Sequence, residues 1–133
     1  MQTVLMIAVA LHVLPAVFWA GTTFALARTA GRGSAGLFAA QMGAATVTVL
    51  IGAYLWGAAH AGVFGPKERF LAVGAICALI AFAMQAIMVG GTLPKLRRDA
   101  DDAAAHARIA LAQRVAALLL GIATLAMAAS KYA

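Results

Sequence analysis

The hydrophobic and polar positions of this chain are arranged in long blocks, without the short period of an amphipathic surface helix. Four almost purely apolar blocks are separated by three short breaks that carry glycine, proline and charged residues. A helix needs about 20 apolar residues to cross roughly 30 Å of hydrocarbon, and each block reaches that length. We therefore predict four membrane-spanning helices, at about 3–27, 35–63, 70–93 and 104–130.

The breaks between the blocks determine how the helices connect. The second break contains the turn-forming pair Gly65-Pro66. Pro94 is expected to end the third helix, because proline has no N–H group to continue the hydrogen-bond ladder. Connections this short place consecutive helices side by side. The predicted fold class is all-α, an integral membrane four-helix bundle with up-down-up-down topology, formed by a single domain over 1–133.

The composition supports a membrane protein and narrows its chemistry. Of the 133 residues, 65% are hydrophobic and 11% are charged, a balance outside the range of soluble globular domains. The single cysteine, Cys77, excludes an intramolecular disulfide. The formal charge of +6 lies almost wholly in the breaks and at helix ends, as membrane topology requires. We therefore expect a lipid bilayer, and not nucleic acid, as the surrounding partner.

The distribution of Lys and Arg also predicts an orientation. The side of the membrane that holds the first and third breaks carries six Lys and Arg residues, whereas the opposite side carries only Lys67, Arg69 and Lys131. These six are Arg28, Arg32, Lys95, Arg97, Arg98 and Arg108. The excess predicts a bacterial inner-membrane protein whose first and third breaks are cytoplasmic and whose two termini are periplasmic. The first block is too long for a signal-peptide core, so we expect it to be retained as a span.

A histidine lies in the middle of the first apolar block, where an ionisable residue is costly and is by default a functional candidate. Pro15, three residues after His12, removes a helical hydrogen bond one turn away and can open space beside the ring. Trp19 follows on the same helical face. Two interpretations of His12 stay open at this point: a neutral imidazole hydrogen-bonded to a neighbouring helix, or a cofactor ligand.

Depth along each helix, at about 1.5 Å per residue, predicts two polar layers in the bundle. The layer nearer the termini holds His12, Tyr54 and Cys77. The deeper layer holds seven side chains, which are Trp19, Thr23, Thr46, Thr48, Gln85, Gln113 and Arg114. Two orientations stay open for Arg114: its long side chain extends to the headgroups, or it points into the bundle towards Gln85.

Haem is the cofactor that suits a cavity in a small helical bundle, because its iron takes a histidine as axial ligand. We expect haem b with His12 as that ligand. His60 lies about six residues, or roughly 9 Å, nearer the surface, so a bis-histidine site needs a deeper second helix. Copper is the alternative cofactor: Met84 and Met88 share one helical face, and thioether ligands select Cu(I).

The spacing of several segments resembles a family of small membrane proteins. Leu11-His12 followed by Trp19-Ala20-Gly21 resembles the LH-x(6)-WxG opening of four-span proteins related to copper-resistance protein D and of the HemJ-type protoporphyrinogen oxidases. Segments 52–56, 93–96 and 114–132 fit the same arrangement. The resemblance implies that His12 takes part in haem b binding, or in copper uptake together with methionines.

Three functions follow as expectations. The first is a haem b-binding redox or electron-transfer protein, whose candidate cofactor-binding residues are His12, Trp19, Tyr54, His60 and Arg114. The second is a copper-handling membrane protein. The third is a non-catalytic subunit of a larger membrane complex or a homo-oligomer, which abundant small residues on the helices favour. The chain has no nucleotide-binding loop, nucleophile triad or paired carboxylates, and the sequence leaves open whether it is an enzyme.

Overall fold

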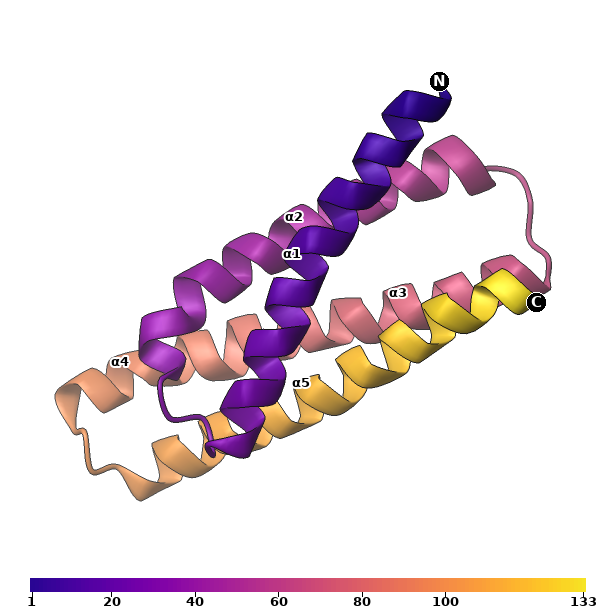
Figure 1. The fold of residues 1–133 in the computed structure, drawn as a ribbon. Helices are drawn as coiled ribbons and strands as arrows, with labels where there is room; N and C mark the ends of the chain where they lie inside the picture. Colours follow the sequence, from indigo (N-terminus) through magenta and orange to yellow (C-terminus); the bar gives the residue numbers. More distant parts are fainter.

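Five α-helices make up almost the whole chain in the computed structural model, which describes residues 1–133. They are α1 (Gln2–Arg28), α2 (Ser34–His60), α3 (Pro66–Met84), α4 (Gly90–Arg98) and α5 (Ala103–Ala129) (Figure 1). A π-helical turn (Gln85–Val89) joins α3 to α4 without a break, and a 3₁₀ turn (Ser130–Tyr132) follows α5. The predicted all-α class is confirmed.

Four helical segments are long and apolar enough to cross a membrane: α1, α2, the continuous run Pro66–Arg98, and the run Ala103–Tyr132. Figure 1 shows that consecutive segments run in opposite directions and that both termini lie towards one end with the α2–α3 loop, which we call the terminal end. The α1–α2 and α4–α5 loops lie at the other end, which we call the basic end. The chain is an integral membrane protein with the predicted up-down-up-down topology.

Pro94 lies inside α4, so the prediction that it ends the third span is wrong. The helix continues to Arg98. A proline removes one helical hydrogen bond and crowds the carbonyl four residues before it, which here belongs to Gly90. The Gly90 N–H already departs from the regular register, because it bonds the carbonyl of Gln85, five residues back. The proline therefore follows a turn in which the hydrogen-bond ladder is already altered.

The π-helical turn keeps one face of the third span buried. Fully or largely buried residues recur there every four positions, at Ala81, Gln85, Val89 and Leu93. In a regular α-helix, residues four apart drift by roughly 40° per step, because four residues exceed one turn of 3.6. A turn with i→i+5 hydrogen bonds holds more residues than an α-turn. It therefore returns Val89 and Leu93 to the face that carries Ala81 and Gln85.

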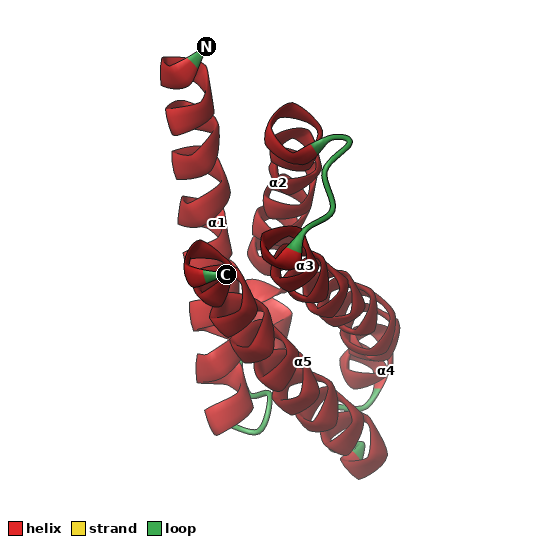
Figure 2. Ribbon diagram, turned by 90° about the vertical axis from the view of Figure 1, so that its right-hand side faces the viewer, coloured by secondary structure: helices red, strands yellow, loops and turns green.

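The helices pack mainly as two pairs, α1 with α2 and α3 with α5, and α1 also packs on α5. Figure 2 shows the terminal-end half of α1 standing apart from α5. Every buried residue of α2 lies between Ser34 and Thr48, in the half nearer the basic end. Apolar side chains of the other halves face outward, such as Leu14 (73% exposed) and Leu50 (64%). The packed part of α1 and α2 is therefore concentrated towards the basic end, and their other halves expose apolar side chains, as helices in a lipid bilayer do.

Small residues let α3 and α5 approach closely, as expected where no hydrophobic effect drives helix association. Ala81, Ala112 and Ala116 are completely buried. A Cβ atom added to Gly74 would lie 2.8 Å from Cγ of Met127 and 3.0 Å from the carbonyl oxygen of Ala123, both on α5. The absence of a side chain at Gly74 is thus a condition of this helix contact.

Candidate functional site

A buried cluster of polar side chains joins all four spans and extends from the middle of the bundle to its basic end. We call it the central polar cluster; its members are Trp19 and Thr23 of α1, Ser34 and Gln41 of α2, Gln85 of the π-helical turn, and Gln113 of α5. Each member is at most 2% exposed. Polar groups at this depth are costly unless they are paired, so the hydrogen bonds among them decide whether the cluster is stable.

Gln85 is the centre of the cluster, since it contacts three of the other members. Its Oε1 accepts the indole N–H of Trp19 at 2.6 Å. Its Nε2 donates to Oγ1 of Thr23 at 3.0 Å and to Oε1 of Gln113 at 2.9 Å. Both amide protons and the amide oxygen of Gln85 are therefore engaged, and the side chain ties the third span to α1 and α5.

Thr23 uses the full hydrogen-bonding capacity of its hydroxyl group. Oγ1 donates to the carbonyl of Trp19 at 2.7 Å and accepts from Nε2 of Gln85 and, at 3.2 Å, from Nε2 of Gln41. Gln41 has fewer hydrogen-bond partners. Its Oε1 is buried and has no hydrogen-bond partner, although the side chain is completely inaccessible. The central polar cluster is thus satisfied around Gln85 and incomplete at Gln41.

Gln113 connects the cluster to the basic end of the bundle. Its Nε2 donates to Oγ of Ser34, the first residue of α2, at 3.2 Å. The hydrogen bonds confirm the prediction that Trp19, Thr23, Gln85 and Gln113 lie at one depth. The prediction is wrong for Thr48, whose carbonyl oxygen contacts His12 of the layer nearer the termini, and Thr46 is exposed on α2. Sequence reasoning missed Ser34 and Gln41, and the signal for Gln41 was present, because it is the one amide side chain in the second apolar block.

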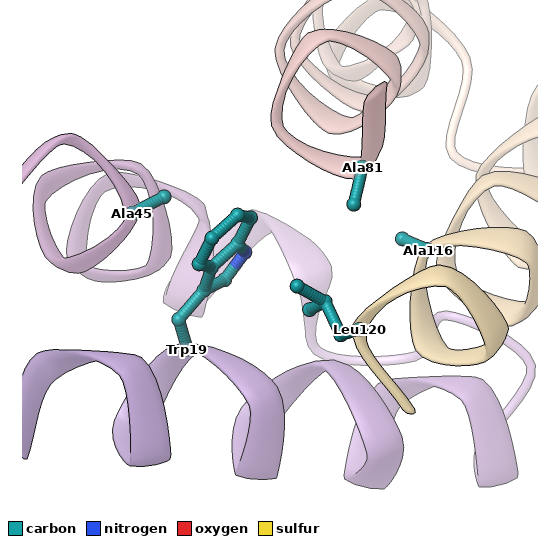
Figure 3. Close-up of a cluster of buried hydrophobic side chains, with 5 residues drawn as sticks. All are labelled: Trp19, Ala45, Ala81, Ala116 and Leu120. Atoms are coloured by element: carbon teal, nitrogen blue, oxygen red, sulfur yellow. The ribbon is translucent and has the colours of Figure 1, made fainter. Parts of the chain in front are cut away.

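Small residues surround the Trp19 ring and leave room for it between the helices. Figure 3 shows the indole enclosed by Ala45 of α2, Ala81 of α3, and Ala116 and Leu120 of α5. Phe82 meets the indole edge-on, with 6.3 Å between ring centroids. Such edge-to-face pairs add to the stabilisation that burial provides. The ring is fixed by packing while its N–H is held by Gln85.

His12 lies on α1 two turns nearer the terminal end than Trp19, and its ring rests on α2. Nδ1 is 2.8 Å from the backbone carbonyl oxygen of Thr48. A carbonyl only accepts, so Nδ1 donates, and in the neutral ring Nε2 keeps its lone pair. A Cβ atom added to Gly52 would lie 2.9 Å from Cε1 of His12. Gly52 therefore provides the space in which the ring contacts the backbone of α2.

The other predicted cofactor-binding residues are not gathered around His12. Tyr54 is 51% exposed, and its position two residues after Gly52 turns it by roughly 200° away from the His12 contact. Arg114 is exposed on the outside of α5, beside the inward-facing Gln113. Of the five candidates only Trp19 and His12 face the interior, and the Trp19 N–H is already bound to Gln85.

His60 lies near the terminal end of the bundle, where it joins α2 to the start of α3. Its Nδ1 is 2.9 Å from Oε1 of Glu68, and the two side chains are 17% and 8% exposed. The other carboxylate oxygen of Glu68 accepts the N–H of Gly65, the N-cap of α3, at 2.9 Å. His60 is eight residues beyond Gly52, or roughly 12 Å along α2. The structure does not bring His60 to His12.

The soft candidate ligands are also dispersed. Cys77 is partly buried in α3, and no group of three His, Cys, Asp or Glu side chains is placed to hold a metal ion. The hydrogen bond between Trp19 and Gln85 sets these two residues at one level, and His12 lies about two turns before Trp19 on α1. At 1.5 Å per residue, Met84 and Met88 are therefore about 9 and 15 Å along the bundle from the level of His12. His12 and the two methionines therefore do not form one site.

The remaining question for the site is whether known proteins share its arrangement. Comparison of the chain with family models, with curated proteins and with solved structures gives no match.

Proposed function

We propose that this integral membrane protein binds haem b and has a redox or electron-transfer role, with His12 as the single axial ligand. The observation that supports the proposal is the Nδ1–H bond from His12 to the carbonyl of Thr48. Histidine ligands in metal sites usually donate their second ring N–H to a backbone carbonyl or carboxylate, which fixes the tautomer and orients the ring. In His12 this leaves the lone pair of Nε2 available to coordinate a metal ion.

The residues present fit a haem with one histidine ligand and do not fit a bis-histidine haem. His60 is engaged with Glu68 at the terminal end, and His106 bonds the carbonyl of Ala100 beyond the basic end of α5. When bound, haem supplies one-electron chemistry at its iron. The chain would hold it through His12, oriented by its bond to Thr48, beside the exposed apolar side chains of the terminal-end halves of α1 and α2.

The same geometry favours haem over copper. A Cu(I) site needs several soft ligands around one ion. The axial separations of Met84 and Met88 from His12 are about 9 and 15 Å, well beyond the span of one coordination sphere. A haem, in contrast, requires only one strong protein ligand and apolar surface for its macrocycle.

An absorption spectrum of the purified full chain, expressed with a haem precursor, tests the proposal. We expect a Soret band that is lost in His12→Ala and kept in His60→Ala and His106→Ala. The two control variants remove the other histidines and leave the Thr48–His12 bond in place. A chain without a Soret band, or an equal loss in all three variants, would overturn haem ligation by His12. The copper content of the same samples tests the alternative that the protein handles copper.

A second candidate function, a non-catalytic subunit or homo-oligomer, is favoured by the uncovered halves of α1 and α2. Large apolar side chains there are about half exposed or more, including Val4, Leu11 and Leu50. Helices with such faces can pack against a further membrane protein as well as against lipid. Cross-linking in native membranes followed by mass analysis separates the two cases, because a monomer gives no larger adduct.

The orientation is also a proposal. The basic end carries six Lys and Arg residues in its loops and adjacent helix turns, against three at the terminal end. The positive-inside rule then places the basic end in the cytoplasm of a bacterial cell and both termini in the periplasm. An exposed Arg114 agrees with this orientation, because its side chain can extend towards cytoplasmic headgroups.

A further inference from the structure

A groove at the basic end lies between α4 and the first turns of α5. Its volume is about 450 Å³, and it is open to the surroundings on one side. Three alanines of α5 form part of its lining, and the other lining residues are Met88, Thr92, Lys95, Asp102, Arg108 and Leu111. The groove is on the far side of the central polar cluster from His12 and has no part in the proposed haem site.

Two cations line the groove without a carboxylate partner. Lys95 and Arg108 are both exposed, and neither forms a salt bridge with a carboxylate. Asp102, the acid in the lining, accepts the N–H of Ala105 at 3.1 Å and so caps the N-terminus of α5. The helix end holds this carboxylate, and two cations against one anion leave the groove lining with a net positive charge.

The polarity of the groove changes along the direction of the helices. Lys95 lies seven residues beyond Met88, or about 10 Å closer to the basic end. Leu111 lies one turn deeper on α5 than Arg108 and is 55% exposed to the membrane. Thr92, which is 2% exposed, lies between the charged and the apolar parts. Cations at the interface and apolar side chains towards mid-membrane match the polarity of a phospholipid.

We propose that this groove binds one anionic phospholipid. Its phosphate lies between the Lys95 ammonium and the Arg108 guanidinium, which form charge-assisted hydrogen bonds with phosphate oxygens. An acyl chain lies along Met88 and Leu111. Basic pockets between membrane helices select anionic lipids for this reason. A zwitterionic lipid binds less well, because its own ammonium group is repelled by the two cations.

Native mass spectrometry of the full chain in detergent, with equal amounts of phosphatidylglycerol and phosphatidylcholine, tests the proposal. We expect one phosphatidylglycerol to be retained in preference to phosphatidylcholine. Each cation near a membrane surface contributes about a fivefold change in affinity, so Lys95→Gln with Arg108→Gln should weaken retention about 25-fold. The matched control, Arg28→Gln with Arg97→Gln, removes the same charge at exposed positions outside the groove lining. It should retain the lipid.

Three results would overturn the proposal. Equal retention of the two lipids would show that the groove does not prefer an anionic lipid. An equal loss of lipid retention in the control double variant would show that the lipid is attracted by the total positive charge and is not bound specifically in the groove. Complete displacement of phosphatidylglycerol by millimolar inorganic phosphate would assign the cations to a free anion. Circular dichroism of both double variants establishes that the helices are intact, which is expected because neither Lys95 nor Arg108 is buried.

Discussion

Single buried amides decide how the four spans fit together. Gln85 and Gln41 are the same residue type and both are completely buried, yet their surroundings differ. Gln85 makes three side-chain hydrogen bonds, whereas Gln41 makes one and leaves its Oε1 unpaired. An interhelical hydrogen bond in a membrane contributes about 0.6 kcal/mol on average. The two positions therefore offer a matched measurement of how much the central polar cluster stabilises the fold.

Gln85→Met should lower the free energy of unfolding by about 2 kcal/mol, the sum expected for three such bonds. Gln41→Met should change it by less than about 0.5 kcal/mol, because removal of an unpaired buried oxygen offsets the one lost bond. Methionine keeps the length and flexibility of glutamine, so packing is little changed. Unfolding in mixed micelles by titration with a denaturing detergent measures both values. Equal losses for the two variants would contradict the central role of Gln85.

Sequence reasoning located the depth of most polar side chains, with Thr48 as an exception, but not the direction in which they point. The rise per residue was enough to place Trp19, Thr23, Gln85 and Gln113 in one layer, and their hydrogen bonds confirm it. Which way a side chain points depends on where the neighbouring helices lie. These spans are apolar on all sides, so no hydrophobic stripe marks the buried face. Arg114 was left with two orientations for this reason, and the packing of α5 turns it outward.

At the scale of helices, the most extensive contact is between α3 and α5, and it requires the glycine at position 74. Gly74→Ala should lower the free energy of unfolding by about 1–3 kcal/mol, since the new methyl group meets Met127 and the backbone of Ala123. Gly43→Ala is the control, because an added Cβ there meets nothing within 4 Å. It should leave stability unchanged or raise it by up to about 1 kcal/mol. A reversed order would show that α3 and α5 are not in close contact.

The α2–α3 connection contains a hydrogen bond between His60 and Glu68 and a helix cap, and the two share one carboxylate. His60→Ala and Glu68→Gln should each lower the melting temperature in detergent, because each removes the bond between the end of α2 and the start of α3. Glu68→Gln also weakens the interaction with the N–H of Gly65. We expect the double variant to be less destabilised than the sum of the single variants. Strict additivity would show that the two side chains do not interact.

The third span shows where local sequence rules are overridden. Pro94 is typical of a helix end, and the sequence therefore predicts a stop there. Packing of Val89 and Leu93 in the core with Ile109 and Ala112 of α5 holds the helix together beyond the π-helical turn. Burial in a tertiary contact outweighs propensity at such a position. Buried positions at strict four-residue spacing, from Ala81 to Leu93, accompany this irregular turn.

At the scale of the whole molecule, the asymmetry of charge predicts which loops face the cell exterior. In a Cys77→Ala background, Phe64→Cys lies in the α2–α3 loop and Ala100→Cys in the α4–α5 loop, and both positions are exposed. A membrane-impermeant maleimide should label Phe64→Cys in intact cells and Ala100→Cys only after lysis, because the basic end is expected to be cytoplasmic. The opposite labelling pattern would reverse the orientation.

The central polar cluster also has a consequence for the order in which the protein is made. A chain that has been synthesised only as far as α2 can form the Thr23–Gln41 bond but leaves the Trp19 indole without its acceptor. Gln85 arrives with the third span, and its amide still lacks Gln113 until α5 follows. Unpaired polar groups are costly in hydrocarbon. A prematurely terminated chain thus retains unpaired polar groups at membrane depth, and these groups find their partners when the last span is inserted.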